Sequence, residues 1–169
     1  MSTLDVLMKR RSIRRFTRDA VSPAHREAVV RAVLQAPSAA DARPWHLVEI
    51  DQRQILDELA SAMEHCDMLR EATWALLVCG DPSLEKIPGF WVQDCSAATQ
   101  NALLAAAALG LGAVWVGLHP VEDRVQAVRG VLGIPATVVP LALVAAGHPA
   151  EDPGFEDRFD AGKLHANRW

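Results

Sequence analysis

The sequence lacks several motifs by which enzymes bind nucleotides or form covalent intermediates. It contains no Gly-x-Gly-x-x-Gly loop and no Walker loop, so nucleotide binding by either route is unsupported. It contains no Gly-x-Ser-x-Gly elbow, and no cysteine lies beside a plausible base in the sequence. A chain that supplies no acid, base or nucleophile of its own is a candidate for chemistry carried by a cofactor.

Cysteines and histidines are too few and too scattered to predict a metal site. Cys66, Cys79 and Cys95 are an odd number without metal-type spacing, so we expect reduced thiols and a cytoplasmic protein. None of the six histidines pairs with another histidine or a cysteine at ligand spacing. We therefore expect each histidine to be a surface or packed residue, and no metal to be bound.

Long apolar runs are also missing. The longest apolar region, residues 102–118, is rich in alanine and glycine and falls short of a convincing membrane span. The first five residues reach a charge before any apolar run begins, so we expect no signal peptide. The length of 169 residues, 50% of them hydrophobic and 22% charged, predicts one folded domain over residues 1–169. A sequence pI near 5.8 argues against general nucleic-acid binding.

Positive charge is concentrated in residues 9–18, which we call the basic strip. It holds six of the 17 lysines and arginines and no acidic residue, so the other 159 residues carry a net charge of −10 when the whole chain carries −4. Arg10, Ser12 and Arg14 share one face if the strip is extended, and Arg10 and Arg14 also meet at i, i+4 in a helix. Two guanidinium groups and a hydroxyl suit a phosphate. The alternatives are a solvated segment or a membrane or nucleic-acid patch.

Hydrophobic spacing predicts helices and short strands without a regular βαβ repeat, which indicates an α+β, sheet-centred fold. Ser22 followed by Pro23 predicts the start of a helix that Pro37 ends. Pro140 lacks a donor for the strand ladder, so its strand should contain a bulge or lie at an edge. The predicted helices are residues 4–8, 22–36, 52–66, 90–109 and 121–132, and the predicted strands are 46–50, 74–79, 113–116 and 138–145.

The longest predicted helix, residues 90–109, is apolar on nearly every face and carries one charge, Asp94. A helix of this kind must be covered on most of its sides. In a chain of this size we expect a second subunit to provide the cover. The tail, residues 151–169, is polar, and we expect it to be stabilised by docking onto another surface.

A second distinctive segment, residues 36–46, places small residues between Pro37 and Pro44 and ends with Trp45 and His46. A helix stop followed by a core tryptophan would explain this pattern. Small side chains would also let a flat ring approach the backbone closely.

These segments together resemble the FMN-dependent nitroreductases in their short, single-domain form. The resemblance runs almost from end to end and rests on several blocks that stand in the family's order. The blocks are Arg10-Arg11-Ser12-Ile13-Arg14-Arg15-Phe16, Ala36-Pro37-Ser38-Ala39, Arg43-Pro44-Trp45, residues 94–106 (DCSAATQNALLAA), Leu109-Gly110-Leu111-Gly112, Trp115-Val116-Gly117, Gly147-His148-Pro149 and His165-Ala166-Asn167-Arg168-Trp169.

The resemblance implies a mostly antiparallel central sheet flanked by helices, in an intertwined homodimer with FMN at the subunit interface. The phosphate and ribityl chain would be held by the basic strip and one C-terminal cation. The candidates are Arg10, Ser12 and Arg14, with Arg11 beside them, and Arg168 or Lys163. The flavin ring would meet a loop of the other subunit and a turn that offers backbone N–H groups near N5. The candidates there are Pro37, Ser38 and Ala39 of the loop, and Gly117 and Leu118 of the turn.

Two positions depart from the family pattern. After Pro-Ser the family has Asn and then Gln before Pro-Trp, whereas this chain has Asp41 and Arg43. A carboxylate near a reduced, anionic flavin is unfavourable unless it is neutralised. We therefore expect Asp41 and Arg43 to form an ion pair, with Arg43 able to contact an anionic substrate group. The chain has no tyrosine, so stacking on the substrate would fall to Phe90, Trp91 or His119.

The implied activity is a ping-pong reduction. NADH or NADPH passes a hydride to N5 of FMN and leaves, and a nitroaromatic, a quinone or a similar acceptor is then reduced. Hydride transfer needs no ionising side chain, which agrees with the missing acid–base motifs. One alternative is a flavin-binding redox sensor or flavin store without turnover. Another is a basic-arm nucleic-acid module, which predicts a colourless protein and salt-dependent DNA binding. We expect a homodimer that acts on small molecules, without nucleic acid or membrane.

Overall fold

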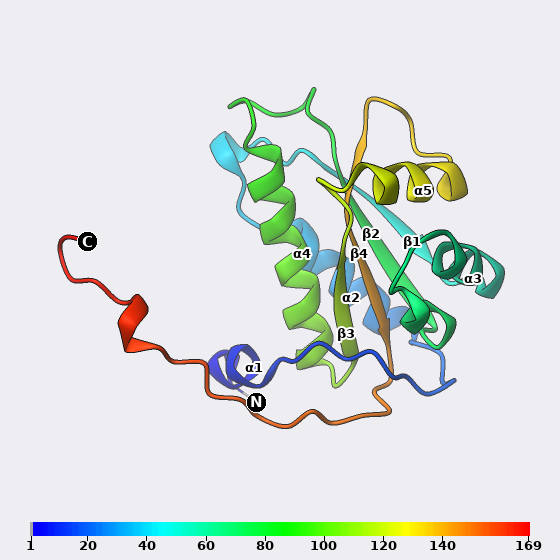
Figure 1. Cartoon of the computed structure of the whole chain (residues 1–169), viewed down its shortest axis with the longest axis horizontal. Helices are drawn as coiled ribbons and strands as arrows, with labels where there is room; N and C mark the ends of the chain where they lie inside the picture. Colours follow the sequence, from blue (N-terminus) through cyan, green and yellow to red (C-terminus); the bar gives the residue numbers. More distant parts are fainter. Residues whose placement is uncertain (1) are drawn as a thin grey trace.

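A four-stranded antiparallel sheet forms the centre of the computed structural model, which describes residues 2–169 (Figure 1). The strands are β1 (Trp45–Ile50), β2 (Trp74–Gly80), β3 (Gly112–Gly117) and β4 (Val139–Gly147). They are ordered β1-β2-β4-β3, and each neighbouring pair is antiparallel. The predicted α+β class and antiparallel sheet are confirmed.

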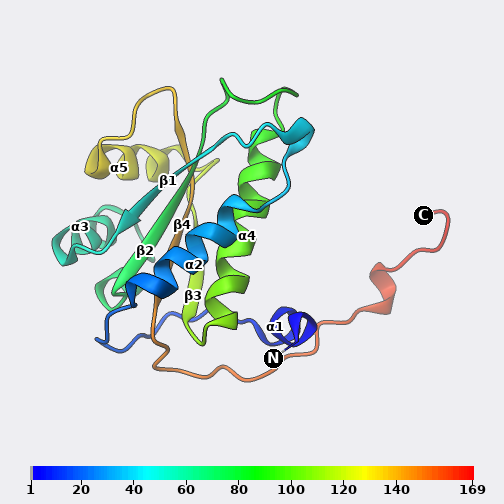
Figure 2. The same cartoon turned by 180° about the vertical axis from the view of Figure 1, so that it is seen from behind.

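Helices cover both faces of the sheet (Figure 2). The helices α2 (Pro23–Leu34) and α4 (Trp91–Ala108) lie on one face, and α3 (Arg53–Ala62) and α5 (Glu122–Leu132) lie on the other. Side chains alternate along β2, so Leu76 and Val78 join the core under α2 and α4, while Leu77 and Cys79 join the core under α3 and α5. Across residues 2–169, the helices all fall short of the length and apolar content that a membrane crossing requires.

For α2 and α3, local sequence signals predict where the helix begins more accurately than where it ends. Ser22 Oγ accepts a hydrogen bond from His25 N–H, and Pro23 is the first helical residue, as predicted. The predicted helix 22–36 ends at position 34, and the predicted helix 52–66 ends at position 62. Met63 is extended and buried, so the apolar spacing beyond the end of α3 reflects packing in the core rather than helix. The short 3-10 helix η2 (Asp67–Arg70) follows.

Pro140 lies inside the sheet, because β4 is a central strand. The register of β4 against β2 shifts at this point: Val78 pairs with Ala142, and Cys79 pairs with Pro140. One residue of β4, Leu141, is therefore extra, which is the arrangement of a β-bulge. The predicted bulge is confirmed, and the alternative of an edge strand is wrong.

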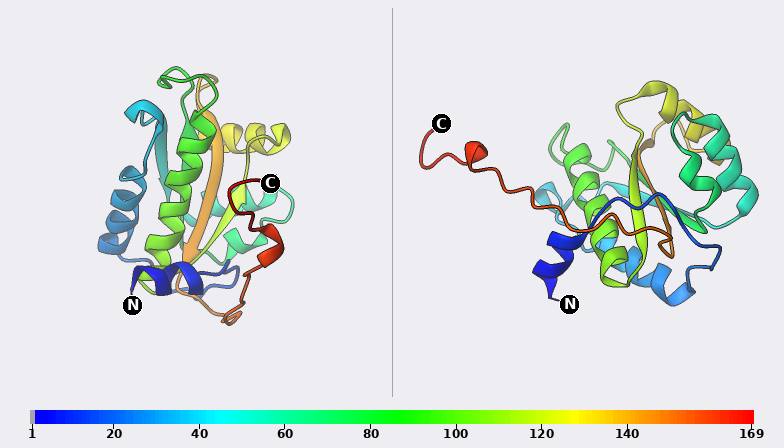
Figure 3. Two further views of the ribbon diagram at one scale, coloured as in Figure 1. Left: turned by 90° about the vertical axis from the view of Figure 1, so that its left-hand side faces the viewer. Right: turned by 60° about the horizontal axis from the view of Figure 1, so that its bottom comes forward.

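The basic strip begins at the last residue of α1 (Thr3–Lys9) and runs beside the start of the edge strand β3 (Figure 3). Ile13 N–H donates to the Ala113 carbonyl at 3.0 Å, and Thr17 N–H donates to the His148 carbonyl at 2.9 Å. Gly112 makes this approach possible, because a Cβ at that position would lie 2.6 Å from the Ile13 side chain. The strip is therefore extended along its central residues and fixed to the sheet.

The C-terminal tail starts beside the basic strip and then leaves the body of the molecule (Figure 3). Glu151 Oε1 accepts hydrogen bonds from the N–H groups of Arg14 and Arg15, at 2.5 and 3.2 Å. Every residue from 151 to 169 is exposed, including the 3-10 helix η3 (Ala161–Lys163). Four of these exposed residues are large and apolar, namely Phe155, Phe159, Leu164 and Trp169. The first part of the tail thus docks on the strip, and the far part has no cover within a single chain.

Replacing Gly112 with alanine should destabilise the protein, because the added methyl group meets Ile13 where the strip docks on β3. We expect the free energy of unfolding, measured by urea denaturation, to fall by about 1–3 kcal/mol. Gly130 is the matched control, since it lies in α5 and nothing comes within 4 Å of an added Cβ. Gly130→Ala should leave stability unchanged or raise it by about 0.5–1 kcal/mol. Equal losses in the two variants would contradict the close docking of the strip.

Candidate functional site

Half of the cations in the basic strip are held by other parts of the chain. The contacts are Arg11 with the Gly154 carbonyl at 2.8 Å and with Glu156 at 3.4 Å, Arg15 with Glu71 at 3.0 Å, and Arg18 with the Arg70 carbonyl at 2.9 Å. The pKa of Glu71 is lowered, first by the hydrogen bond from the Phe16 N–H and then by Arg15. These three arginines are thus occupied in fixing the strip to η2 and to the tail.

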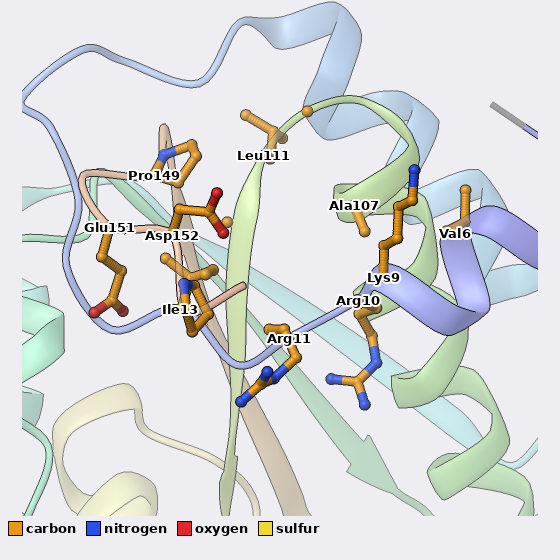
Figure 4. A pocket seen from close by; sticks show the side chains of 13 residues that line it. Val6, Lys9, Arg10, Arg11, Ile13, Ala107, Leu111, Pro149, Glu151 and Asp152 are labelled. Carbon is orange, nitrogen blue, oxygen red and sulfur yellow. The ribbon is translucent and has the colours of Figure 1, made fainter. Parts of the chain in front are cut away.

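The side chains of Arg10, Ser12 and Arg14 are not engaged in this way. No hydrogen bond or ion pair joins them to any side chain or carbonyl within residues 2–169. Figure 4 shows Arg10 and Arg11 extending in one direction from the strip, whereas the Lys9 ammonium points in the opposite direction. The guanidinium groups of Arg10 and Arg14 and the hydroxyl of Ser12 therefore remain available for an anion, as the sequence predicted.

A cavity of about 330 Å³ opens between α1, the strip and the start of the tail (Figure 4). Its cations are Lys9, Arg10 and Arg11, but Glu151 and Asp152 also line it. The two carboxylates offset the positive charge. This cavity by itself is therefore not a selective anion site.

The turn predicted to meet a flavin ring lies at the other end of β3. Gly117 is four positions along the strand from Ala113, which lies beside the strip, and this is about 13 Å of extended strand. A Cβ at Gly117 would have one neighbour, the Trp115 indole nitrogen at 4.0 Å, so a flat group can approach the backbone there. Leu118 differs from the prediction, because its N–H donates to the Leu141 carbonyl at 3.0 Å and its side chain is fully buried. The Leu118 amide, which was predicted to face the flavin, thus donates to the bulge residue Leu141 instead.

The loop that contains Pro37, Ser38 and Ala39 has an unusual backbone. Ala40, Asp41 and Arg43 have φ angles of 52°, 53° and 50°. Non-glycine residues rarely adopt this left-handed region, and such strain concentrates at functional sites. Within the loop, Ser38 Oγ accepts a hydrogen bond from the N–H of Arg43 at 2.9 Å.

Asp41 and Arg43 form the predicted ion pair. The Arg43 Nε and Nη2 atoms lie 2.7 and 3.0 Å from the two carboxylate oxygens of Asp41. The hydrogen bonds from Arg43 lower the pKa of Asp41 below its usual value. Both side chains are exposed, so solvent screens the attraction between them. The negative charge of Asp41 is nevertheless neutralised where it stands.

Two residues that sequence reasoning did not assign to the site anchor this loop. Asp94 Oδ1 accepts a hydrogen bond from the Ala39 N–H at 2.9 Å, and Lys86 Nζ donates to the Ala40 carbonyl at 2.9 Å. Asp94 is 5% exposed, and its Oδ2 is buried without a partner among the described residues. Such an oxygen costs on the order of 1–3 kcal/mol. In the sequence, Asp94 is marked as the single charge on an otherwise apolar helix, whereas nothing in the sequence marks Lys86.

The loop and the basic strip lie at opposite ends of α4 (Figure 1). Asp94, which holds the loop, is in the first turn of this helix, and Ala107, which lines the cavity beside the strip, is in its last turn. Ala107 is thirteen positions along the helix from Asp94, which is about 20 Å. A single chain therefore does not bring the loop and the strip to one ligand. Lys163 and Arg168 are likewise in the extended tail, and Lys163 lies 3.7 Å from Asp160.

The aromatic candidates for substrate stacking have different environments. Trp91 is 9% exposed and packs over Gly80, where an added Cβ would lie 2.1 Å from its ring. It is a core residue of the single chain, so little of its ring faces solvent where a substrate could stack. The His119 ring lies 4.9 Å from that of Trp91 and is half-buried, and Phe90 is 38% exposed. Phe90 and His119 remain as candidates.

The thiols do not offer a nucleophile. Burial raises the pKa of Cys79 and of Cys95 to about 12, and it also raises the pKa of Cys66. A thiol with such a pKa stays protonated near neutral pH, and the thiolate is the reactive form. Within residues 2–169, no group of three or more His, Cys, Asp or Glu side chains is arranged to hold a metal.

Comparison with known proteins gives the family. The model of the family described as Nitroreductase family matches residues 7–87 and 61–148. A protein from Methanothermobacter thermautotrophicus with the provisional name NADH dehydrogenase/NAD(P)H nitroreductase is 44% identical over 100% of this chain and 88% of its own length. A crystal structure from Bacteroides thetaiotaomicron with the same provisional name is 38% identical, with a TM-score of 0.95 over 99% of this chain and 98% of that one. A provisionally named nitroreductase from Desulfovibrio desulfuricans, solved in complex with FMN, is 31% identical, with a TM-score of 0.86 over 100% and 98%. With matches of this extent, the chain belongs to the nitroreductase family.

Proposed function

We propose that this protein is an FMN-dependent oxidoreductase that uses NADH or NADPH to reduce nitroaromatics, quinones or similar small acceptors. The observation that carries the proposal is the set of Arg10, Ser12 and Arg14, whose side chains form no hydrogen bond or ion pair with another group in residues 2–169. The relative from Desulfovibrio desulfuricans that was solved with FMN supports the same assignment.

The residues present fit FMN better than a dinucleotide. The strip supplies cations for one terminal phosphate, and about 13 Å further along β3 the backbone at Gly117 is open to a flat ring. A phosphate at one end and an aromatic ring at the other match the chemistry of FMN. FMN held there would supply a ring able to accept a hydride from NADH or NADPH and to pass the electrons to the acceptor. The chain itself binds the phosphate, orients the ring and keeps water away from one of its faces.

A second copy of the chain is part of the proposed site. The loop around Ser38 and the basic strip are separated by the length of α4, so a flavin on the strip would meet the loop of another copy. The far tail, with Phe155, Phe159 and Trp169 exposed, also needs a surface to cover it. We expect it to dock on the second copy and to bring Arg168 or Lys163 to the phosphate. The protein would then be a cytoplasmic homodimer of single-domain subunits.

A flavin store without turnover is the alternative. The two departures from the family pattern, Asp41 and Arg43, are what leaves that alternative open, and Arg43 neutralises the charge of Asp41 in the bidentate pair. The neutral pair favours the enzyme. Anaerobic addition of NADH or NADPH to the purified yellow protein should bleach its visible spectrum rapidly. Nitrofurazone or menadione should then restore the colour, whereas a store would stay oxidised on the same timescale.

Removing either arginine of the proposed phosphate site should weaken flavin binding. Arg10→Ala or Arg14→Ala loses a charge-assisted contact worth about 1.5–3 kcal/mol, so the Kd for FMN should rise by roughly ten- to a hundredfold. Fluorescence titration of the flavin-depleted protein measures this change. Arg18→Ala removes the same charge from the same strip, but its guanidinium binds the Arg70 carbonyl, so its Kd should stay close to that of the wild type. Arginine variants that purify fully yellow and resist dialysis would exclude this phosphate site.

A charge on the uncovered side of α4 should prevent assembly. Leu104 is half-buried in a single chain although it lies on an almost uncharged helix. Leu104→Glu should therefore give insoluble or flavin-free protein, because a dimer interface would bury the new carboxylate. Gln54→Glu adds the same charge at the exposed start of α3, on the other side of the sheet, and should remain dimeric and yellow. The test is sedimentation equilibrium at micromolar concentration, and a wild-type monomer that still holds FMN would contradict the proposal.

The pair of Asp41 and Arg43 should tune the choice of acceptor. Changing one partner leaves an uncompensated charge beside the proposed ring site, so each single substitution should reduce kcat/KM more than the double substitution Asp41→Asn plus Arg43→Gln. The double variant should keep FMN and lose preference for carboxylate-bearing nitroaromatics. The measurement is kcat/KM for one neutral and one acidic nitroaromatic in all four combinations. Independent effects with an unchanged ratio of acidic to neutral substrate would show that the pair has no part in selection.

A further inference from the structure

The loop of residues 38–43 is held in a conformation that it would not keep alone. Ala40, Asp41 and Arg43 all lie in the left-handed region, although none of them is glycine. Backbone of this kind persists only when surrounding contacts fix it. The contacts that fix it from outside the loop come from Asp94 and Lys86.

Asp94 provides the buried contact. Its Oδ1 accepts the Ala39 N–H at 2.9 Å, and its side chain is almost fully enclosed. A hydrogen bond to a carboxylate is stronger than one between neutral groups, and low local polarity strengthens it further. Lys86, by contrast, is exposed and binds the Ala40 carbonyl from the solvent side. The position of the loop therefore depends chiefly on Asp94.

The stability of helix α4 does not by itself explain why position 94 carries a carboxylate. Asp94 lies in the first turn, where a negative charge favours a helix, but its hydrogen bond goes to Ala39 in another segment. Its second oxygen is buried and has no donor among residues 2–169. An apolar residue of similar shape would often be more stable at such a position. A carboxylate that costs stability and holds a strained loop is expected where the loop has a function.

We propose that Asp94 is a positioning residue that fixes the 38–43 loop in the conformation in which it meets the flavin of the neighbouring subunit. This inference rests on the proposed FMN function. Asp94 touches neither the flavin nor the substrate in this proposal, and it acts through the backbone of Ala39. Helix α4 thereby connects the proposed dimer interface to the placement of the loop.

The test distinguishes the effect of the Asp94 hydrogen bond to the Ala39 N–H from the effect of side-chain packing at position 94. Asp94→Leu keeps a branched side chain of similar shape and removes the acceptor, whereas Asp94→Asn keeps an acceptor for the Ala39 N–H. Thr99→Ala is the control, because Thr99 is also buried on α4 but its hydroxyl donates to the Cys95 carbonyl of its own helix. Each purified, flavin-bound protein is compared by melting temperature, by the Kd for FMN and the visible spectrum, and by hydrogen–deuterium exchange at residues 38–43.

Asp94→Leu should raise the Kd for FMN by about tenfold or more and speed exchange in the loop, while its melting temperature stays within a few degrees of the wild type or rises. Asp94→Asn should restore the affinity to within about threefold and slow the exchange again, because the oxygen that the amide replaces has no donor. Thr99→Ala should leave loop exchange and FMN affinity unchanged, even if it lowers the melting temperature.

The proposal is overturned if Asp94→Leu binds FMN with wild-type affinity and loop exchange, or if Asp94→Asn is as defective as Asp94→Leu. Should Asp94→Leu not fold, the wild-type protein still decides, since an Ala39 amide that exchanges as fast as an unbonded surface amide would exclude the contact. A wild-type protein that binds no FMN, yet has a protected Ala39 amide, would instead refute the proposed function and leave the anchor in place.

Discussion

The pairing of β2 with β4 is the interaction on which the rest of the structure depends. Every residue of β2 is buried, and so is nearly every residue of β4. A strand pair buried on both faces needs a helical layer on each, and the two cores under α2 and α4 and under α3 and α5 supply them. β3 is left as an edge strand against which the basic strip can lie. The candidate phosphate site is thus built on an edge strand that the β2–β4 pair supports.

The candidate site is divided according to rigidity. Its cationic end is fixed to β3 by backbone hydrogen bonds. Three of its arginines bind other parts of the chain, while the side chains of Arg10 and Arg14 remain available. Its other end is a strained loop, held to the start of α4 by one buried carboxylate. The first part supplies the charged side chains for the phosphate. The second part needs fine placement, because a backbone that meets an aromatic ring works at close range.

The sequence was sufficient for features that depend on neighbouring residues. Ser22 and Pro23 predicted the start of α2, Pro140 predicted a bulge, and the spacing of Asp41 and Arg43 predicted their ion pair. It was insufficient where distant segments compete for one group. The N–H of Leu118 donates to the carbonyl of Leu141 in the bulge. Trp91 packs in the core over Gly80, where a side chain would leave no room for its ring. Asp94 could be seen as unusual in sequence, but its partner at position 39 is set by tertiary packing.

The separation of the strip and the loop by the length of α4 has a genetic consequence. In the proposed symmetric dimer, each ligand site takes its cationic end from one subunit and its loop from the other. A lesion in the strip of one subunit and a lesion in the loop of the other therefore fall together in one site and leave the second site intact. Two defective alleles of this kind would complement each other when expressed in the same cell, and each mixed dimer would have up to half the activity of a wild-type dimer. Two alleles with lesions in the same end would not.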